Sequence, residues 1–252
     1  MSFFKKVLSS VGIGAAKVDT ILLNESCEPG GELEATVMIQ GGDIEQQIDS
    51  IYFSVHCHYI KEIEDDKVRQ TATLASFKIA ESLTIAPNEQ QEFPVQLTLP
   101  EELPLTLGHS KVWLSTGLDI AQALDPGDKD YLNVHPNDLQ QAVFEAVEQL
   151  GFSLVQVENE AARFGRQPFI QEFEFKPTAG HYAGRLDELE IFFLPNTQGM
   201  ELFMEIDRKA RGLGGMLAEM MDLDESKVRV QLTQHDIPTM TEMLDDIISR
   251  HC

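Results

Sequence analysis

The chain is poor in cysteine, in tryptophan and in positive charge, and each shortage excludes a class of protein. Its 252 residues include 3 Cys and 1 Trp, and 19 Lys and Arg stand against 42 Asp and Glu. The cysteines Cys27, Cys57 and Cys252 are odd in number and lack C-x-x-C spacing, so neither a disulfide framework nor a cysteine-based metal or redox site is expected. A reducing cytoplasm suits such a chain best.

The charge balance also limits the partners. A formal net charge of −23 repels nucleic acid, because proteins bind phosphate backbones chiefly through Lys and Arg. The same charge disfavours anionic membrane surfaces unless a local basic patch overrides it. The sequence also lacks an apolar stretch of membrane-spanning length and a secretory leader, so we expect a protein that is neither membrane-embedded nor exported.

What the chain does contain is a series of alternating strand patterns. With 42% hydrophobic and 24% charged residues it can fill ordinary cores. Apolar residues alternate with polar ones over residues 33–40 and again over 51–59, with Gly41-Gly42 between them. Such alternation indicates half-buried strands, and the glycine turn predicts that these two pair as a β-hairpin. A further strand before Pro29 would complete a three-stranded antiparallel sheet.

The remaining strand and helix signals predict two domains, residues 1–135 and 136–252. About seven strands between residues 17 and 119 suit a β-sandwich, and the break at His135-Pro136 marks the boundary. A helix capped by Asn137 or Asp138 should follow and end at Gly151. More strands come next, and Thr239 to Glu242 match a capping box for a last helix.

Three stretches together resemble one known bacterial family. They are Trp113-Leu114-Ser115-Thr116-Gly117-Leu118-Asp119-Ile120-Ala121, then Leu124-Asp125-Pro126-Gly127-Asp128-Lys129-Asp130-Tyr131, and Val134-His135-Pro136. With the strands upstream of them they resemble the sporulation-control family SpoOM, whose fold is arrestin-like. The resemblance implies a mainly β protein of two arrestin-like antiparallel β-sandwich domains with a few short helices. It also implies a non-enzymatic regulator or adaptor that binds proteins and controls sporulation or another cell-cycle, division or stress process.

The residues that bear chemistry do not assemble into a catalytic or metal motif. His56 and His58 lie on the same side of one strand, since side chains alternate, but two ligands do not make a metal site. The aspartates near residue 125 lack the spacing of a calcium loop, and aspartate favours turns because its side chain bonds nearby backbone. No catalytic, cofactor-binding or metal-binding residue is therefore assigned, and no cofactor is expected.

Two segments are candidate binding elements. The first, Phe3, Phe4, Lys5 and Lys6, opens a short amphipathic helix that either anchors the chain to a membrane or partner or docks on its own sheet. The second contains Arg208, Lys209 and Arg211, followed by Met216 and Met220. A positive loop beside adaptable methionines fits a protein partner, and the alternative is a loop and small helix that cover the core.

A third candidate is an inter-domain polar cluster. Arrestin-like proteins keep charged pairs near the junction of their halves, and the resemblance motivates the hypothesis that some of these groups meet. The carboxylates are Asp119, Asp125, Asp128 and Asp130, and the guanidinium groups are Arg163 and Arg166. The alternative is that the aspartates serve turns and caps.

Two other functions stay open at the level of sequence. One is a ligand-binding protein or enzyme with a pocket at the interface between domains, where such sites often lie. The other is a peripheral membrane protein that uses the N-terminal helix.

Overall fold

The computed structural model describes residues 14–64, 66–80, 82–120, 127–163, 165–207 and 227–251. Within these ranges the chain divides into two compact units. The first consists of residues up to Cys57, Thr73–Leu103 and Lys111–Val134, and the second of His58–Ala72, Pro104–Ser110 and the residues from His135 onward. The chain passes into the second unit at His135, next to the predicted boundary at Pro136, and two earlier segments also belong to that unit.

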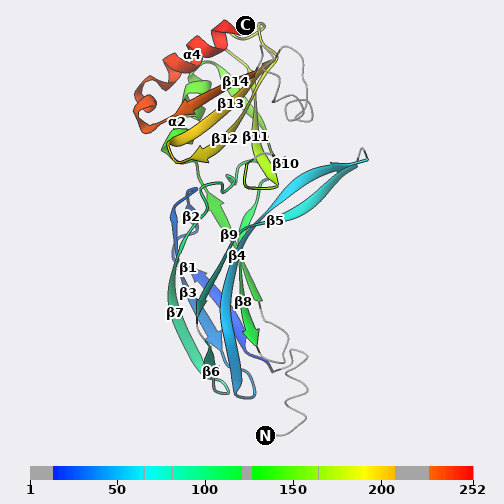
Figure 1. The fold of residues 1–252 in the computed structure, drawn as a ribbon, viewed down its shortest axis with the longest axis vertical. Coiled ribbons are helices and arrows are strands. Elements are labelled where there is room, and N and C mark those ends of the chain that lie inside the picture. The colour runs from blue at the N-terminus through cyan, green and yellow to red at the C-terminus, as the bar shows by residue number, and fades with distance from the viewer. Residues whose placement is uncertain are drawn as a thin grey trace. The chain divides into compact units, whose positions relative to one another are not determined.

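In its described residues the first unit contains strands and no helix (Figure 1). They are β1 (Lys17–Leu22), β2 (Ser26–Cys27), β3 (Glu32–Gln40), β4 (Gln46–Ile63), β5 (Asp66–Ala80), β6 (Leu83–Ile85), β7 (Gln90–Thr98), β8 (Val112–Ile120) and β9 (Gly127–Val134). The far halves of β4 and β5, beyond Cys57 and before Thr73, belong to the second unit.

These strands form two sheets that face each other. One has the order β1-β3-β7; in the other β4, β8, β9 and β2 follow in sequence, and β5 and β6 also pair with β4. The Thr20 hydroxyl of β1 lies 2.7 Å from the Thr116 hydroxyl of β8, which joins the two inner faces through a buried hydrogen bond. Every second side chain along these strands points inward and fills the space between the sheets. Val37, Phe53 and Val55 are examples, and all three are fully buried.

The predicted hairpin between residues 33–40 and 51–59 is wrong, although both strands exist. β3 pairs with β1 and β7, and β4 pairs with β8, so the two strands lie in different sheets. At Gly41 the backbone N–H donates to the Glu89 carbonyl, and a Cβ on Gly42 would collide with the Gly14 backbone. Because glycine has no Cβ, the chain can pass closely by other backbone segments here as it crosses from one sheet to the other. The local sequence of such a crossing looks the same as that of a hairpin turn.

The described residues of the second unit form an antiparallel sheet, two α-helices and a short 3₁₀-helix. The strands are β10 (Phe152–Ala161), β11 (Phe169–Pro177), β12 (Glu188–Asn196), β13 (Gly199–Asp207) and β14 (Lys227–Leu232), and they are hydrogen-bonded in that order. The end of β4 joins the outer edge of β10 through the parallel pair Ile60 and Glu160. The Asn159 amide supports this contact by donating to the His58 carbonyl at 2.9 Å.

The helix α2 (Asp138–Gln149) begins and ends as predicted. Asn137 accepts from the Gln140 backbone N–H at 3.0 Å, and Gln140 accepts from the Asn137 N–H at 3.1 Å, so the two residues form a capping box. Gly151 follows the helix at φ +93°, a left-handed conformation that glycine adopts without strain. Phe144 then packs its ring 5.0 Å from Phe173 and 5.6 Å from Phe193, which anchors α2 to the sheet.

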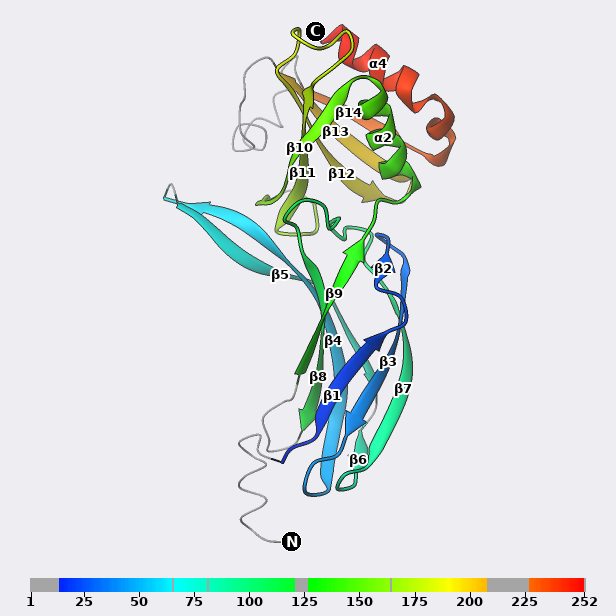
Figure 2. The ribbon, with the colours of Figure 1, turned by 180° about the vertical axis from the view of Figure 1, so that it is seen from behind.

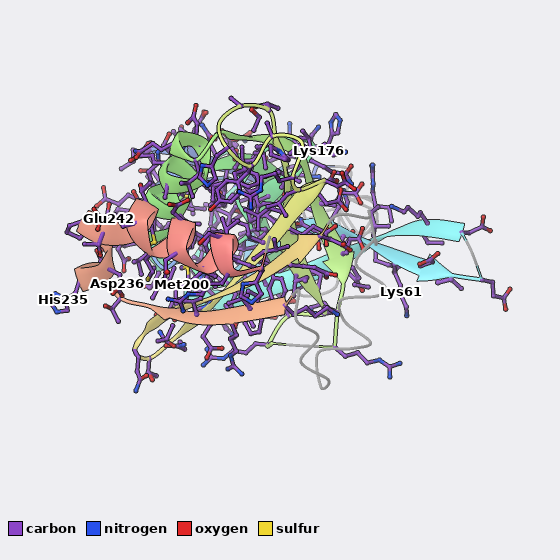
Figure 3. All side chains as sticks on the ribbon, turned by 90° about the horizontal axis from the view of Figure 1, so that it is seen from above. Lys61, Lys176, Met200, His235, Asp236 and Glu242 are labelled. Atoms are coloured by element: carbon purple, nitrogen blue, oxygen red, sulfur yellow. The ribbon has the colours of Figure 1, made fainter. Side chains whose placement is uncertain are left out.

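The last helix, α4 (Met240–Arg250), exists, but its predicted capping box at Thr239 and Glu242 is wrong. The 3₁₀-helix η1 (Gln234–Thr239) precedes it, and there the Asp236 carboxylate accepts from the Thr233 N–H at 2.7 Å. The capping box therefore begins at Thr233 and not at Thr239, because the chain is already helical when it reaches Thr239. Figure 3 shows Asp236 and Glu242 at this end, with α2 and α4 on the same side of the sheet. Met240, Leu244 and Ile248 are buried.

Neither helix, nor any other in the described ranges, is long and apolar enough to cross a membrane.

Candidate docking surface on the first unit

The outward face of the β4-β8-β9 sheet carries a row of aromatic side chains. His56, Trp113 and Tyr131 occupy adjacent register positions on the three strands, and we call these residues the aromatic row. Figures 1 and 2 show the three strands side by side in both views. Because the neighbours of each residue along its strand point inward, all three side chains share the outer face.

The rings of the aromatic row contact one another across the strands. His56 stacks on Trp113 with centroids 5.5 Å apart, and Tyr131 meets Trp113 edge-on at 6.5 Å. Trp113 is only 6% exposed, whereas Tyr131 is 54% exposed. Cross-strand aromatic contacts of this kind stabilise a sheet, and they also hold the exposed tyrosine ring in one position.

A lysine ammonium covers the centre of the row. The Lys129 Nζ lies 4.0 Å from the Trp113 ring centroid and 4.9 Å from that of Tyr131. Lys111 approaches the Tyr131 ring at 5.7 Å. Among the described residues Lys129 takes part in no ion pair, and its ammonium group lies over aromatic ring faces.

Hydroxyl groups from β5 border the row. The Thr73 hydroxyl lies 3.2 Å from His56 Nδ1, and the Ser76 hydroxyl lies 3.4 Å from that of Ser54. In the second unit the Thr71 hydroxyl contacts His58 Nδ1 in the same way, also at 3.2 Å. The two histidines noted in the sequence therefore each contact a threonine.

The inner face of β9 carries two of the aspartates of the predicted polar cluster. The Asp128 carboxylate accepts from the Thr20 backbone N–H at 2.8 Å, so it ties β1 to β9. Burial, together with the nearby Asp128 carboxylate, raises the pKa of Asp130 to about 7. Both side chains thus lie between the sheets of the first unit, and Asp128 has a structural partner there.

The other members of that cluster belong to different units or lie outside the described ranges. Asp119 is exposed at the end of β8, and Asp125 falls outside the described residues. Arg163 and Arg166 are exposed in the second unit. A meeting of these groups across the two units stays a prediction.

The two predicted binding segments also stay predictions. Phe3, Phe4, Lys5 and Lys6 lie outside the described residues, as do Arg208, Lys209, Arg211, Met216 and Met220.

The second unit has a different electrostatic feature, a set of glutamates on the sheet face opposite α2. Glu174, Glu190 and Glu205 are direct register partners on β11, β12 and β13. Glu190 and Glu205 are 5% and 4% exposed, and the Glu190 Oε2 atom has no hydrogen-bond partner. Burial, followed by the charge of neighbouring carboxylates, raises the pKa of Glu190 to about 8 and that of Glu172 to about 9. These two groups are therefore protonated at neutral pH.

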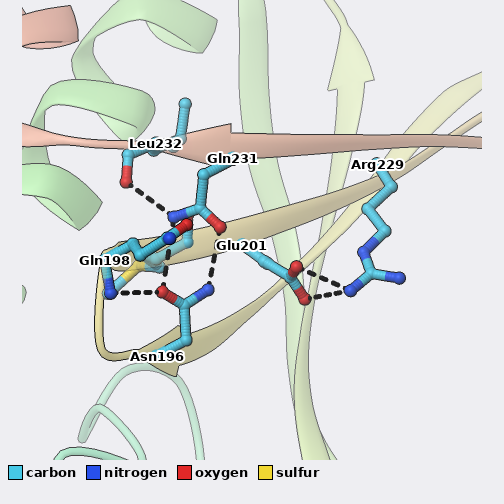
Figure 4. A network of polar contacts seen from close by, with 7 residues as sticks. Asn196, Gln198, Glu201, Arg229, Gln231 and Leu232 are labelled. Carbon is cyan, nitrogen blue, oxygen red and sulfur yellow. Dashed lines mark hydrogen bonds and ion pairs between the residues drawn. The ribbon is translucent and has the colours of Figure 1, made fainter.

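Two pairs of polar side chains join β14, at the edge of the same sheet, to its neighbours. Arg229 donates to both carboxylate oxygens of Glu201, at 2.6 and 2.7 Å, and Asn196 exchanges hydrogen bonds with Gln231 (Figure 4). Glu190, whose Oε2 atom has no hydrogen-bond partner, lies on β12, two strands from this edge. Among the described residues no three His, Cys, Asp or Glu side chains are arranged to hold a metal ion.

The buried cysteines are poor nucleophiles. Burial raises the pKa of Cys57 to about 12 and, with the Glu28 charge, that of Cys27 to about 11. Since the thiolate is the reactive form, both thiols are inert at neutral pH.

The aromatic row was not identified from the sequence. Trp113 and Tyr131 served there only as part of the family resemblance, and Lys129 was not singled out. Alternation places Trp113 outward on its own strand, but its contact with Tyr131 depends on the register between β8 and β9.

Comparisons with known proteins give one consistent result. A family model described as SpoOM protein matches residues 4–210. The sporulation-control protein spo0M of Bacillus subtilis (strain 168) is 43% identical over 256 residues, which covers 100% of this chain and 99% of the relative. The crystal structure of Spo0M from Bacillus subtilis is 41% identical and matches with a TM-score of 0.88, over 95% of this chain and 100% of that chain.

These matches confirm the resemblance seen in the sequence and the mainly β, arrestin-like fold with few helices. The chain belongs to the SpoOM family.

Proposed function

We propose that this chain is a cytoplasmic, non-enzymatic regulator that acts by binding another protein through the aromatic row of its first unit. The Bacillus subtilis relative carries the name sporulation-control protein, which supports a role in sporulation or a related developmental process. A regulator of this kind needs a surface that a partner can recognise.

The observation that carries the proposal is the packing of Tyr131, Trp113 and Lys129. Tyrosine and tryptophan are enriched in protein interfaces, because a rigid ring provides a large contact area at little entropic cost. Here the exposed Tyr131 ring is held by Trp113 and Lys129. Tyr52, which is 37% exposed, lies on the same face over Gly117. The face therefore presents exposed tyrosine rings that are already held in place by their neighbours, which lowers the cost of binding.

Site-directed photocrosslinking in the native cytoplasm tests this proposal. A photoreactive phenylalanine analogue would replace Tyr131, and matched controls would replace Glu92 on the opposite sheet and Glu242 on α4, both exposed positions. We expect a discrete crosslinked protein from position 131 that is absent from positions 92 and 242. The proposal fails if position 131 yields no adduct, or if all three positions yield the same products.

A further inference from the structure

The face around the aromatic row concentrates positive charge in a strongly acidic protein. Lys129, Lys111 and Lys78 are all exposed on the outer side of the sheet that contains β5, β4, β8 and β9. Lys78 lies two residues beyond Ser76, whose hydroxyl reaches Ser54, so it shares the outer face. In a chain with 19 Lys and Arg against 42 Asp and Glu, three lysines gather on this one face of the described residues.

Carboxylates are absent from the same stretch of the described surface. Residues 111–117, at the start of β8, include no Asp or Glu. The two acidic residues between Gly127 and Tyr131 on β9 are Asp128 and Asp130, and both side chains point inward. The next outward carboxylate along β8 is Asp119, which lies about 20 Å from Trp113 at about 3.3 Å per residue.

The ammonium groups on this face are available to an anion. Lys129 contacts ring faces, and Lys111 is 5.7 Å from the Tyr131 centroid. A cation over an aromatic ring keeps most of its N–H donors directed outward. An incoming carboxylate can therefore accept from Lys129 without the rupture of an existing ion pair.

We propose that this face binds an acidic segment of the partner protein, with carboxylates on Lys129 and Lys111 and an apolar side chain against Tyr131. The inference rests on the proposed function, since it names the chemistry of the partner at the same surface. Four strands spaced about 4.8 Å apart give a face roughly 15 Å wide, which matches about five residues of extended chain. Complementary charge at such a face favours one class of partner over another.

The size of the face is what favours a short segment over a larger anion. Screening at physiological salt limits charge effects to about 8 Å, so the lysines dominate locally despite the net charge of −23. Nucleic acid and an anionic membrane spread their charge over a wider area and would also meet the acidic remainder of the surface.

Binding of a labelled peptide to the full chain tests the inference. The probe is a fluorescent peptide of about ten residues, rich in Glu with one central Phe, compared with peptides in which Gln or Lys replaces every Glu. Anisotropy gives the affinity, and the emission of Trp113, the single tryptophan, reports whether the peptide reaches the row. We expect saturable binding of the Glu peptide alone, weakened about tenfold or more between about 0.05 M and 0.5 M salt.

Two lysine variants make the test specific. Lys129→Gln should weaken the Glu peptide about tenfold, the size of one lost charge-assisted contact. Lys17→Gln removes an exposed lysine from β1 in the opposite sheet and should leave the affinity unchanged. The inference is overturned if the Glu peptide does not bind at low salt, if the Gln or Lys peptide binds equally well, or if Lys129→Gln has no effect.

Two further outcomes separate the sources of failure. Anionic phosphatidylglycerol vesicles that bind in a Lys129-dependent manner, while the Glu peptide does not, would overturn the inference in favour of a membrane. A crosslinked protein at position 131 without affinity for the Glu peptide would leave the proposed function in place and overturn only the acidic chemistry. Loss of both results would overturn both proposals.

Discussion

The Lys129 ammonium lies 4.0 Å from the centre of the Trp113 ring, on the outer face of the first unit. At an exposed site such a contact contributes about 0.5–1 kcal/mol. We therefore expect Lys129→Ala to lower the free energy of unfolding by no more than about 1 kcal/mol and to change the Trp113 emission of the folded state, as measured by urea titration. Lys111→Ala, the matched control, should leave the emission unchanged. If Lys129→Ala lowered the free energy of unfolding by several kcal/mol, Lys129 would be mainly a residue that stabilises the fold and not one that is available to a partner.

Gly151→Ala tests how α2 ends. At φ +93° an alanine is strained, and its Cβ would collide with the carbonyl oxygen of Ala179. The backbone N–H of Ala179 donates to the Gly151 carbonyl at 2.9 Å, which holds the two segments close together. The strain of the left-handed conformation alone is about 1–2 kcal/mol, and the clash adds to it. Thermal unfolding should show a clear loss of stability. Gly184→Ala is the control, since Gly184 also has positive φ but a Cβ there meets nothing. Equal losses at the two glycines would show that the clash contributes nothing.

Leu244 tests whether α4 belongs to the second unit. The side chain is fully buried, so Leu244→Ala should destabilise the protein by about 2–5 kcal/mol, and Leu244→Asp by more because it buries a charge. Glu242→Ala, at an exposed position in the first turn of α4, should change stability little. An unchanged melting temperature for Leu244→Asp, with altered partner capture, would make the helix a binding element.

The glutamates of the second unit predict that stability falls as pH rises. Burial raises the folded-state pKa values of Glu160, Glu190 and Glu172 from the ordinary 4.5 to about 7, 8 and 9. A raised pKa means that the folded state binds the proton more tightly, so the stabilisation is complete below about pH 4.5 and is lost as the pH rises through 7 to 9. We expect the melting temperature to fall by roughly 4 °C or more between pH 6 and pH 9.

A variant separates these groups from the general charge of the protein. Glu190→Gln keeps the shape of the protonated acid and cannot ionise, so it should flatten the decline of the melting temperature with pH. Glu242→Gln removes one exposed charge and should leave the decline as it is. Parallel pH curves for the parent and Glu190→Gln would show that Glu190 does not titrate as its burial indicates.

The strands of this fold could be predicted from alternation, whereas their partners could not. Residues 33–40 and 51–59 form β3 and β4 as expected, yet β3 joins β7 across 50 residues of chain, in register from Glu32 to Gln40. Glycine at positions 41 and 42 permits a hairpin or a crossing, and only the packing of the two sheets decides between them. Local signals succeeded where the interaction is local, as in the Asn137 and Gln140 capping box.

The candidate surface depends on the same missing information. Alternation assigns Trp113 to the outside of β8 and Tyr131 to the outside of β9, and register alone makes them neighbours. The buried acids could not be predicted either, because the sequence suggests that they are exposed. Glu190 stands between Leu189 and Ile191, which is the alternation expected of a half-exposed strand. Its side chain is 5% exposed, a consequence of tertiary packing that the pattern does not encode.

Spore yield in Bacillus subtilis is the measurement that tests the central claim most directly. The gene for the spo0M relative would be replaced by one for this chain, either unchanged or carrying Lys129→Glu, at equal protein levels. The account predicts that the unchanged chain restores the spore yield of the parent strain and that Lys129→Glu leaves it at the level of the deletion. A Lys129→Glu chain that restores the full yield would contradict the assigned surface, and an unchanged chain that restores nothing would contradict the proposed role.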